Sequence, residues 1–378
     1  MKKLSGNGAY TWWTRPVFLQ APTHMYFTTI SDARLWRAFR NDSGDYVDLD
    51  TCPERDDHNA PSILARPNKD RLAFATRHAK SNVVNTFRAS GGIDFHDAGN
   101  LWHPGTVTYT QVLDSNDRVA VFSRVNHFQW NFFLSENWGL TWGDSVEFLN
   151  SGVHTGLFYM TTAPSTTPGL YHFAAYGHPV NSSFRGLVYG TINVATGDIS
   201  GPSGVVGNLD GTNLPLSVDD FDDVVPTTGT EVARMFDVGE AHGHPVVVYA
   251  KWDDDNNVPA GYWLAHRDGL GVWTHVDLGV LAGAEFWAPS RYYGGMSVAK
   301  DGSGRVFTAH EAAGVWTVDE HPLLADMTFG TPRVIATDSD YPLVRPYAVE
   351  DGDAVVWQRL IKYNHYTDYF IQYWTEGD

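Results

Sequence analysis

Four residues in the first third of the sequence could together transfer protons and bind a carboxylate: His58, His78, Tyr109 and Arg124. Histidine and tyrosine can donate and accept protons, and the planar guanidinium of arginine can hold a carboxylate through two parallel hydrogen bonds. These are the groups that β-elimination from a uronate requires. Once its carboxylate is neutralised, the uronate can lose its C5 proton to a base while an acid protonates the leaving oxygen at C4. The product carries a C4–C5 double bond.

The spacing of these residues predicts that they meet in pairs across two β-hairpins. Residues equidistant from a hairpin turn face each other, with Cβ atoms roughly 4.5–5.5 Å apart. His58 and His78 are equidistant from Asn68, in the first predicted turn, and Tyr109 and Arg124 are at nearly equal distances from the second turn. All four lie away from the turns, so we expect them to converge at one rim of the fold.

Each of the four residues also has a structural interpretation. Arg124 could form an ion pair, as most exposed arginines do, and Tyr109 could be a core aromatic residue with its hydroxyl at the edge. His78 could be an exposed loop residue. The chemical interpretation depends on the combination, because two neighbouring hairpins deliver four reactive groups to the same rim.

The rest of the sequence is typical of short strands joined by tight turns. Glycine is abundant, with 36 residues, aromatic residues make up 14% of the chain, and helical periodicity is nearly absent. Hairpins recur about every 45–55 residues, which is the scale of propeller blades. An N-terminal unit lies around Thr23–Val47. The six hairpins that follow are Ser62–Arg66 with Arg71–Arg77, Thr106–Leu113 with Arg118–Arg124, Leu157–Thr162 with Leu170–Tyr176, Val232–Val238 with Pro245–Trp252, Gly295–Ala299 with Arg305–His310, and Pro346–Glu350 with Ala354–Arg359.

These seven units predict an all-β fold, a seven-bladed β-propeller with four-stranded antiparallel blades, as a single domain over residues 1–378. We expect the aromatic-rich segments Tyr10–Leu19 and Tyr363–Trp374 to complete one blade together and close the ring. Two β-sandwich domains are the alternative, but no linker or low-complexity stretch divides the chain. The segment Ser135–Trp142 fits the S-x-D-x-G-x-T-W turn motif of propellers (the Asp-box), with Asn137 in place of aspartate. It predicts a polar-capped turn whose Trp142 packs between blades.

Composition excludes several classes of partner. The net charge of −18 argues against nucleic acid, although a local basic pocket can still bind an acidic group because net charge is screened over about 8–10 Å. No apolar run is long enough for a membrane span. Cys52 is the only cysteine, which rules out an intrachain disulfide and a cysteine-based zinc site. Met1–Gly6 lacks the apolar core of a signal peptide. We expect a secreted, extracellular monomer whose signal is absent from this sequence, or a protein carried on a virus particle.

Several short stretches resemble BNR-repeat-containing proteins, and specifically the seven-bladed ulvan lyases. They are Asp56–Ile63 with Thr76–His78, Thr108–Thr110 with Val121–Arg124, Tyr293–Met296, Val344–Tyr347, Val356–Arg359 and Tyr363–Tyr369. The resemblance implies a polysaccharide lyase acting on an anionic, uronate-containing polysaccharide such as ulvan. It implies that Arg124 neutralises the uronate, that His58 and Tyr109 act as base and acid in an order left open, and that His78 lines the same groove.

The resemblance further implies substrate-binding residues around this centre. The candidates are Asn59, Asn126, His127, His154, Tyr159 and His178. No cofactor and no catalytic metal are expected. Some members of the family bind a structural metal, and the run Asp253–Asp255 could supply oxygen ligands to calcium. We favour a solvated turn for that run.

Two other functions remain open. A sialidase-like glycoside hydrolase would need an arginine cluster with a tyrosine nucleophile and a glutamate, or else a pair of carboxyl groups. Asp56 and Asp57 are the carboxylates directly beside His58 in the sequence. A non-catalytic carbohydrate-binding propeller, such as a phage receptor-binding head, would use the same rim without needing the histidine–tyrosine–arginine set.

Overall fold

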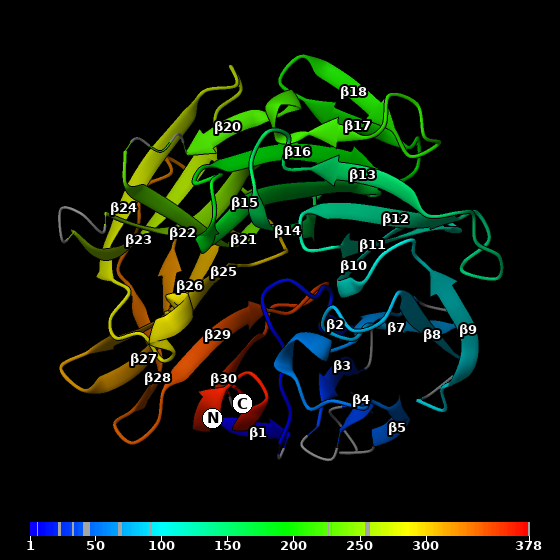
Figure 1. The fold of residues 1–378 in the computed structure, drawn as a ribbon. Coiled ribbons are helices and arrows are strands. Elements are labelled where there is room, and N and C mark those ends of the chain that lie inside the picture. The colour runs from blue at the N-terminus through cyan, green and yellow to red at the C-terminus, as the bar shows by residue number, and fades with distance from the viewer. Residues whose placement is uncertain are drawn as a thin grey trace.

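The computed structural model shows a seven-bladed β-propeller, as predicted. It describes residues 1–5, 7–21, 24–31, 34–40, 46–66, 70–90, 93–225, 227, 229–253 and 258–376. Seven separate sheets are arranged as a ring, with the two chain ends close together (Figure 1). Within the described ranges, no helix has the length and apolar character needed to span a membrane. Asn68, Asp254 and Asp255 lie outside these ranges.

Six of the seven blades contain four antiparallel strands that follow one another in the sequence, whereas blade 7 takes one of its four strands from the N-terminus. Blades 3 and 4 carry extra strands. Blade 1 comprises β2 (Phe18–Gln20), β3 (Met25–Ile30), β4 (Leu35–Arg40) and β5 (Tyr46–Thr51), and blade 2 comprises β6 (Ser62–Leu64), β7 (Arg71–Ala75), β8 (Val83–Ala89) and β9 (His96–Trp102). Blade 3 comprises β10 (Val107–Ser115), β11 (Arg118–Val125), β12 (Gln129–Ser135), β13 (Val146–Asn150) and β19 (Leu216–Ser217). Blade 4 comprises β14 (Gly156–Pro164), β15 (Leu170–Ser182), β16 (Leu187–Asn193), β17 (Asp198–Gly201), β18 (Gly204–Asn208) and β20 (Asp222–Val225).

The remaining three blades have four strands each. Blade 5 comprises β21 (Glu231–Ala241), β22 (His244–Asp253), β23 (Val258–Arg267) and β24 (Trp273–Leu281), and blade 6 comprises β25 (Gly295–Val298), β26 (Arg305–Ala312), β27 (Val315–Pro322) and β28 (Arg333–Asp338). Blade 7 comprises β29 (Leu343–Ala348), β30 (Val355–His365), β31 (Asp368–Thr375) and β1 (Lys2–Ser5). Three short 3₁₀ helices complete the described structure: η1 (Asp57–Asn59), η2 (Val218–Asp220) and η3 (Ala288–Ser290).

Burial along the strands explains why their sequences differ from the inside of a blade to its edge. The first strands, such as β29 (Leu343–Ala348), are buried along their whole length, because they face neighbouring blades on both sides. The edge strand β24 is exposed at most alternate positions. The register of the first hairpin follows the predicted geometry: Ser62 pairs with Phe74, as expected for a turn centred at Asn68. This register is what brings the two ends of the first hairpin together.

The ring is closed by a different N-terminal segment from the one expected. The strand that pairs with β31 is β1, with Lys3 opposite Trp374, whereas Tyr10–Leu19 was expected to take this place. Residues 8–17 instead form a segment that contacts several blades and is almost fully buried. Its aromatic residues are buried in the core clusters, which explains why the segment resembles a strand in sequence.

This N-terminal segment is fixed by contacts with blades 3, 5 and 7. Arg15 donates its backbone N–H to the carbonyl of Thr110 at 2.8 Å, and its guanidinium lies 2.9 Å from the buried carboxylate of Asp237. Asp237 also pairs with Lys300 of blade 6 at 2.8 Å. The carbonyl of Tyr10 accepts a hydrogen bond from Arg345. The segment therefore links blades far apart in sequence and holds Trp12 and Trp13 among them.

The turn at Ser135–Trp142 has the capped geometry that its sequence predicts. The side chain of Asn137 accepts a hydrogen bond from the backbone N–H of Thr141 at 2.8 Å, and Ser135 Oγ accepts from Gly139 at 2.8 Å. Trp142 reaches blade 2, with its ring 5.8 Å from that of Phe74, but it is only partly buried. The buried tryptophan of the turn is Trp138, whose indole donates to the carbonyl of Asp70.

We expect Trp138→Ala to destabilise the fold by about 3–5 kcal/mol, the usual cost of deleting a buried aromatic side chain. Trp142→Ala should cost less, since this ring is partly exposed. Urea unfolding of the two variants measures both changes in the free energy of unfolding. A loss at Trp142 that equals or exceeds the loss at Trp138 would contradict this assignment.

Candidate active site

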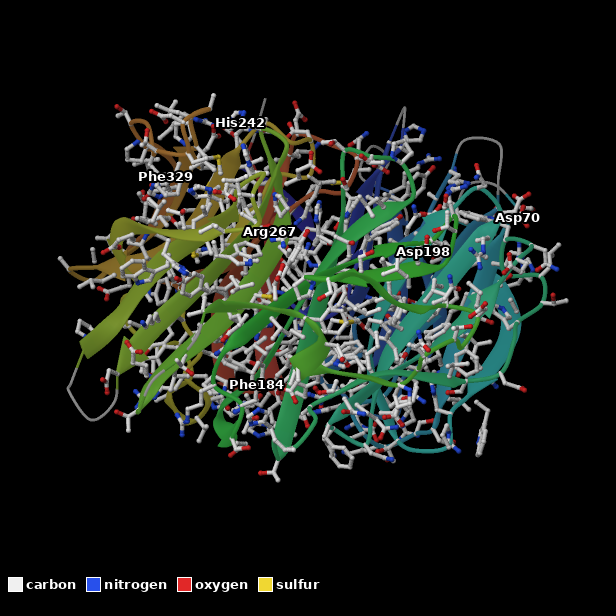
Figure 2. All side chains as sticks on the ribbon, turned by 90° about the horizontal axis from the view of Figure 1, so that it is seen from above. Asp70, Phe184, Asp198, His242, Arg267 and Phe329 are labelled. Atoms are coloured by element: carbon white, nitrogen blue, oxygen red, sulfur yellow. The ribbon has the colours of Figure 1, made fainter. Side chains whose placement is uncertain are left out.

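The candidate site lies at the rim that holds the turns between the second and third strands of each blade. Figure 2 shows the ring edge-on, with Phe184, in the turn between β15 and β16, at this rim. His78 follows β7 and lies in the equivalent turn of blade 2, whereas His58 lies in η1, just before β6. Tyr109 is near the start of β10 and Arg124 near the end of β11. The chain directions therefore bring all four predicted residues to one rim, on two adjacent blades.

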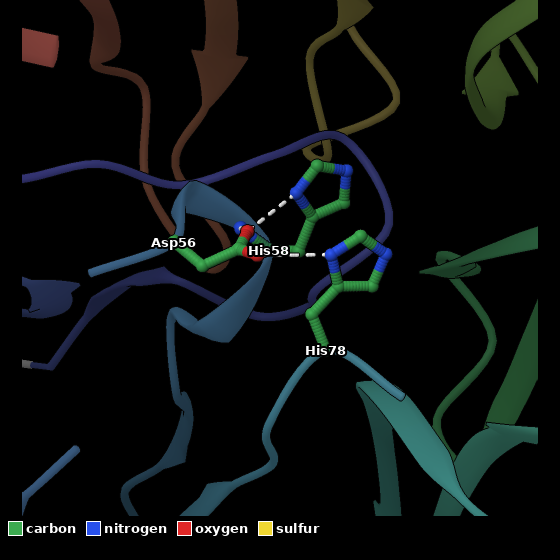
Figure 3. A group of neighbouring side chains, drawn as sticks. All are labelled: Asp56, His58 and His78. Carbon is green, nitrogen blue, oxygen red and sulfur yellow. Dashed lines mark hydrogen bonds and ion pairs between the residues drawn. The ribbon is translucent and has the colours of Figure 1, made fainter. Parts of the chain in front are cut away.

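Asp56 connects two stacked histidines. One carboxylate oxygen lies 2.7 Å from Nδ1 of His58 and the other lies 2.9 Å from Nδ1 of His78 (Figure 3). The imidazole centroids are 4.1 Å apart and the rings are nearly parallel. Asp56 also caps η1 by accepting a hydrogen bond from the backbone N–H of His58. Because both Nδ1 atoms face the same carboxylate, the Nε2 atoms of both rings point away from it.

The two histidines have different charges near neutral pH. Burial opposes a charge on His58, but the carboxylates of Asp56 and Asp57 outweigh it and raise the pKa to about 9. Burial and the neighbouring His58 cation lower the pKa of His78 to about 4, although its hydrogen bond to Asp56 acts in the opposite direction. His58 is therefore a cation with a free Nε2–H, whereas His78 is neutral. Since His78 donates Nδ1–H to Asp56, its Nε2 lone pair can accept a proton.

Asp57 is held ionised by a second group of partners. Its Oδ2 accepts hydrogen bonds from Arg345 at 2.8 Å and from the hydroxyl of Tyr363 at 2.7 Å. Burial favours the neutral form, but Arg345 and His58 outweigh it, so the pKa of Asp57 lies below its usual range. The pKa of Asp56 is also lowered, because the two histidines outweigh its burial. Neither carboxyl group carries a proton to donate near neutral pH.

The side chains of Tyr109 and Arg124 meet, although the predicted backbone pairing is wrong. Arg124 pairs with Thr108, and a β-bulge separates this pair from the next one, Gln111 with Phe122. Tyr109 lies within the bulge with a φ of 63°, a conformation uncommon for residues other than glycine. The guanidinium of Arg124 nevertheless lies 4.7 Å from the centroid of the Tyr109 ring. A bulge in β10 thus re-aims the tyrosine and keeps the contact.

Tyr109 and Arg124 are buried hydrogen-bond donors that lack acceptors. The hydroxyl of Tyr109 and the Nε and Nη1 atoms of Arg124 have no partner, and no described carboxylate lies within ion-pair distance of Arg124. Burial raises the pKa of Tyr109 well above its usual value, so the hydroxyl keeps its proton. Buried polar groups are nearly always paired, and leaving them unpaired is costly. An anionic ligand would supply acceptors to both residues.

Trp13 of the N-terminal segment packs in the middle of this group. Its ring is 4.3 Å from Tyr159, 5.3 Å from Tyr109 and 6.3 Å from His58, measured between centroids. Its indole N–H donates to the hydroxyl of Tyr176 at 3.0 Å. The segment that fills the ring is therefore also part of the site, which ties the placement of the reactive groups to the N-terminus.

Of the six candidate substrate-binding residues, two lie beside the centre and two more are in the loop that follows Arg124. Tyr159 stacks against Arg124, with the guanidinium 4.8 Å from the ring centroid, and His178 lies 5.8 Å from Tyr159. Asn126 and His127 are exposed in the loop that follows Arg124, and the Arg124 charge acts on His127. Tyr159 and His178 therefore pack beside the central group, and His127 lies close enough to be affected by the charge of Arg124.

The other two candidates do not face the space beside Arg124. Asn59 is fully buried and has both ends engaged within the protein: it accepts from the backbone N–H of His78 at 2.6 Å and donates to Sγ of Cys52 at 3.3 Å. It supports His78 from behind. His154 lies in the loop before β14, where its ring packs 5.0 Å from Phe184. The structure does not bring His154 into contact with the central group.

Five residues of the site were not among those expected: Trp13, Arg234, Tyr292, Arg345 and Tyr366. The ring of Tyr366 stands edge-on to both histidines, at 5.1 and 5.5 Å. Arg234 and Arg345 are each about fully buried within an inner strand. In the sequence, a charged residue inside an otherwise apolar first strand could have indicated that these two arginines belong to the site. No comparable feature of the sequence marks Trp13, Tyr292 and Tyr366.

A metal ion is not needed to explain the histidine pair. Asp56, His58 and His78 offer ligand atoms that lie within 4.8 Å of one another. However, both Nδ1 atoms already form short contacts with the Asp56 carboxylate, which accounts for the arrangement through protons alone. A cation at this place would compete for those same nitrogens.

The charge state of His58 can be tested directly. We expect its imidazole to titrate near pH 9 in a proton NMR titration, since the cation is stabilised until the pH rises through that value. Asp56→Asn should lower the pKa of His58 by about 1–3 units, because it removes an adjacent opposite charge. Glu54→Gln is the matched control, since Glu54 pairs with Arg77 instead. A His58 pKa that does not change in Asp56→Asn would contradict the assigned network.

Comparisons with known proteins identify similar folds only among solved structures, since no protein-family model and no curated protein matches the sequence. A structure described as a polysaccharide lyase of the PL25 family, an ulvan lyase, superimposes with a TM-score of 0.74 at 12% identity, covering 100% of this chain and 96% of the other. A second structure of this kind, bound to -[GlcA(1-4)Rha3S]-, gives 0.73 at 12% identity with the same coverage. The polysaccharide lyase Uly1 gives 0.56 at 11% identity over 99% of this chain and 90% of the other. At these identities the similarity establishes the propeller fold.

Proposed function

We propose that this protein is a polysaccharide lyase that cleaves an anionic, uronate-containing polysaccharide by β-elimination, with ulvan as the lead substrate. The observation that carries the proposal is the buried Arg124, which has no carboxylate partner and lies on a tyrosine whose hydroxyl is also unpartnered. A neutral histidine completes the set: His78 stacks on His58, whose ring centroid lies 5.7 Å from that of Tyr109. The propeller fold is shared with lyases of this type, one of them bound to a glucuronate–rhamnose sulfate chain.

In the proposed reaction, Arg124 binds the uronate carboxylate and stabilises the charge that grows there as the C5 proton leaves. The neutral His78 accepts that proton on Nε2, with Asp56 holding its Nδ1–H. Tyr109 donates its hydroxyl proton to the glycosidic oxygen as the C4–O bond breaks. The products are a C4–C5 unsaturated uronate and a free hydroxyl on the departing chain, and solvent returns the proton from His78 to Tyr109.

His58 acts in this scheme as a fixed cation. Its pKa of about 9 keeps it charged, so it adds positive potential beside the carboxylate and leaves proton acceptance to His78. No cofactor enters the reaction, because each proton has a donor and an acceptor within the protein. We also propose that the enzyme acts outside the cell, where such polymers are found, and as a monomer.

A glycoside hydrolase fits the site less well. Hydrolysis with a carboxylic acid catalyst requires a carboxyl group whose pKa is raised so that it carries a proton. Asp56 and Asp57 have lowered pKa values and are already paired with cations. A binding protein without activity would leave the reactive histidine pair unexplained.

The test is to mix the protein with ulvan and with other uronate polymers while recording ultraviolet absorbance and new reducing ends. A lyase produces both signals together, since the C4–C5 double bond is conjugated with the carboxylate. New reducing ends without absorbance would establish a hydrolase instead. Binding without either signal would establish a non-catalytic receptor.

A further inference from the structure

The bulge in β10 that re-aims Tyr109 is held from its other edge by the N-terminal segment. The pairing of β10 with β11 skips Tyr109 and Thr110, which lie opposite the single residue Ser123. The carbonyl of Thr110 accepts instead from the backbone N–H of Arg15 at 2.8 Å, and the carbonyl of Arg15 accepts from the N–H of Val112 at 2.9 Å. Arg15 thus forms a short parallel bridge with β10 directly after the bulge.

A buried glutamine joins the same segment to the bulge. Gln111 is fully buried, and its Nε2 donates to the carbonyl of Trp13 at 2.5 Å. Its Oε1 accepts from the backbone N–H and from the hydroxyl of Thr162 in β14, at 3.1 and 2.8 Å. The backbone of Trp13 is thereby fixed beside the bulge, while its ring packs 5.3 Å from that of Tyr109.

The side chain of Arg15 is anchored to blades 5, 6 and 7. Its guanidinium lies 2.9 Å from the carboxylate of Asp237 in β21 and 3.5 Å from that of Glu350, just after β29. Asp237 is fully buried, and its carboxylate also binds Lys300 at 2.8 Å and the hydroxyl of Ser297 at 2.6 Å, both from blade 6. Burial opposes the charge on Asp237, but Arg15 and Lys300 outweigh it, so its pKa stays below its usual range. Three other blades therefore determine where Arg15 meets β10.

Tyr109 requires a hold of this kind. Its φ of 63° is uncommon for a residue other than glycine and persists where the surrounding structure imposes it. Successive side chains in a regular strand alternate between the two faces of the sheet, so a shift of one residue would turn the tyrosine away from Arg124. The bulge therefore decides whether the hydroxyl lies beside the guanidinium.

We propose that Arg15 is a positioning residue: anchored by Asp237, it holds the bulge of β10 and keeps the Tyr109 hydroxyl in place for proton donation. The inference rests on the proposed function, in which Tyr109 is the acid. Arg15 is 2% exposed and two carboxylates engage its guanidinium, so it acts through Tyr109 and not on the substrate. Its loss should lower kcat and leave KM nearly unchanged, because Arg124 holds the carboxylate of the substrate.

Arg15→Gln tests this role. Glu350, whose pKa burial raises to about 7, can take up a proton and keep the remaining buried charges balanced, so we expect the variant to fold. We expect kcat on a uronate polysaccharide to fall about 10- to 100-fold, the usual effect of a small misplacement of a reacting group. Arg15→Lys keeps the charge beside Asp237 and should restore part of the loss. An unchanged kcat in Arg15→Gln would overturn the inference.

A double-mutant cycle separates positioning from general damage to the fold. In the Tyr109→Phe background the hydroxyl is already absent, so Arg15→Gln should lower kcat little further. The same fold-loss in both backgrounds would show a structural role only. If Arg15→Gln does not fold, Arg15→Lys takes its place in the cycle, and equal losses there would overturn the inference in the same way.

The matched control is Arg88→Gln, which breaks a partly buried ion pair. Arg88 lies 2.7 Å from the carboxylate of Asp70, at the rim opposite to the site (Figure 2). Its replacement removes one positive charge and one ion pair, as Arg15→Gln does, without contact to β10 at the bulge. We expect it to leave kcat unchanged in either background.

A measurement without substrate separates the inference from the proposed function. In protein labelled with fluorotyrosine, Tyr109→Phe identifies the fluorine NMR signal of Tyr109. Arg15→Gln should shift that signal, and Arg88→Gln should leave it in place. If no uronate yields unsaturated product, the proposed function fails, while a shifted signal still supports the hold on Tyr109. A signal that does not move in Arg15→Gln would overturn the inference even if the protein is a lyase.

Discussion

Arg124→Ala is expected to lower kcat on a uronate polysaccharide by about 10²–10³-fold, the usual cost of losing one donor that stabilises a developing oxyanion. Arg124 is the fixed cation nearest to Tyr109, and its guanidinium is held between the rings of Tyr109 and Tyr159. It therefore needs no reorganisation when the carboxylate of the substrate gains charge. Because this charge grows mainly in the transition state, kcat should fall more than KM rises.

Arg124→Lys distinguishes a planar clamp from a simple charge. Lysine keeps the positive charge but loses both the fork of N–H groups and the stacking on the two rings, so this variant should remain strongly impaired. The control is Arg333→Gln, which removes one positive charge from an exposed arginine of β28 that pairs with Glu320. Thermal melting establishes that the variants are folded. If Arg124→Ala retains wild-type kcat, the uronate must be neutralised elsewhere, and the proposal would lose its central observation.

The sequence predicted most of the fold because hairpins carry local information. Alternating residues and polar turns determined the strands, and equal spacing about a turn placed His58 opposite His78 correctly. Those features depend on residues within about twenty positions of one another. The strands and turns of each blade could therefore be predicted separately from those of the other blades.

What the sequence could not predict depends on contacts between distant segments. Tyr10–Leu19 has the pattern of a strand. Its aromatic residues, however, suit the buried centre of the ring equally well, and β1 is the strand that pairs with β31. The β-bulge at Tyr109 shifts the register by one residue and has no marker in the sequence. The turn motif predicted that Trp142 is the buried tryptophan of the capped turn, whereas in the structure Trp138 is the more deeply buried of the two.

The electrostatics of the site also required three dimensions. Asp56 could be seen beside His58 in the sequence, but its bridging of two histidines depends on the end of β7 returning to η1. That bridge separates the two pKa values and leaves His78 neutral. His78 is for this reason the proton acceptor that we propose, whereas the sequence left that role open between His58 and Tyr109. Arg345 reaches Asp57 from the opposite end of the chain. The four expected residues were thus brought together, while the groups that set their charges came from elsewhere.

Tyr109→Phe is expected to lower kcat by about 10²–10⁴-fold, the range for losing a general acid or base, with substrate binding nearly unchanged. Phenylalanine keeps the ring against Arg124 and Trp13 and removes only the hydroxyl, which is buried and has no partner. Because burial raises the pKa of Tyr109, the hydroxyl is protonated near neutral pH and has a proton to give. A donor is needed only when the leaving oxygen is basic.

A substrate with a better leaving group tests separately whether Tyr109 acts as the acid. On a uronate that carries dinitrophenolate at C4, departure needs no proton, so the wild type and Tyr109→Phe should react at similar rates. His78→Ala should remain impaired on the same compound, because the C5 proton must still be removed. A Tyr109→Phe defect of equal size on both substrates would show that the hydroxyl serves another purpose, such as binding the carboxylate. If Tyr109→Phe keeps the wild-type kcat on the polysaccharide, Tyr109 takes no part in proton transfer. The free Nε2–H of His58 would then be the remaining donor beside the proposed acceptor, His78.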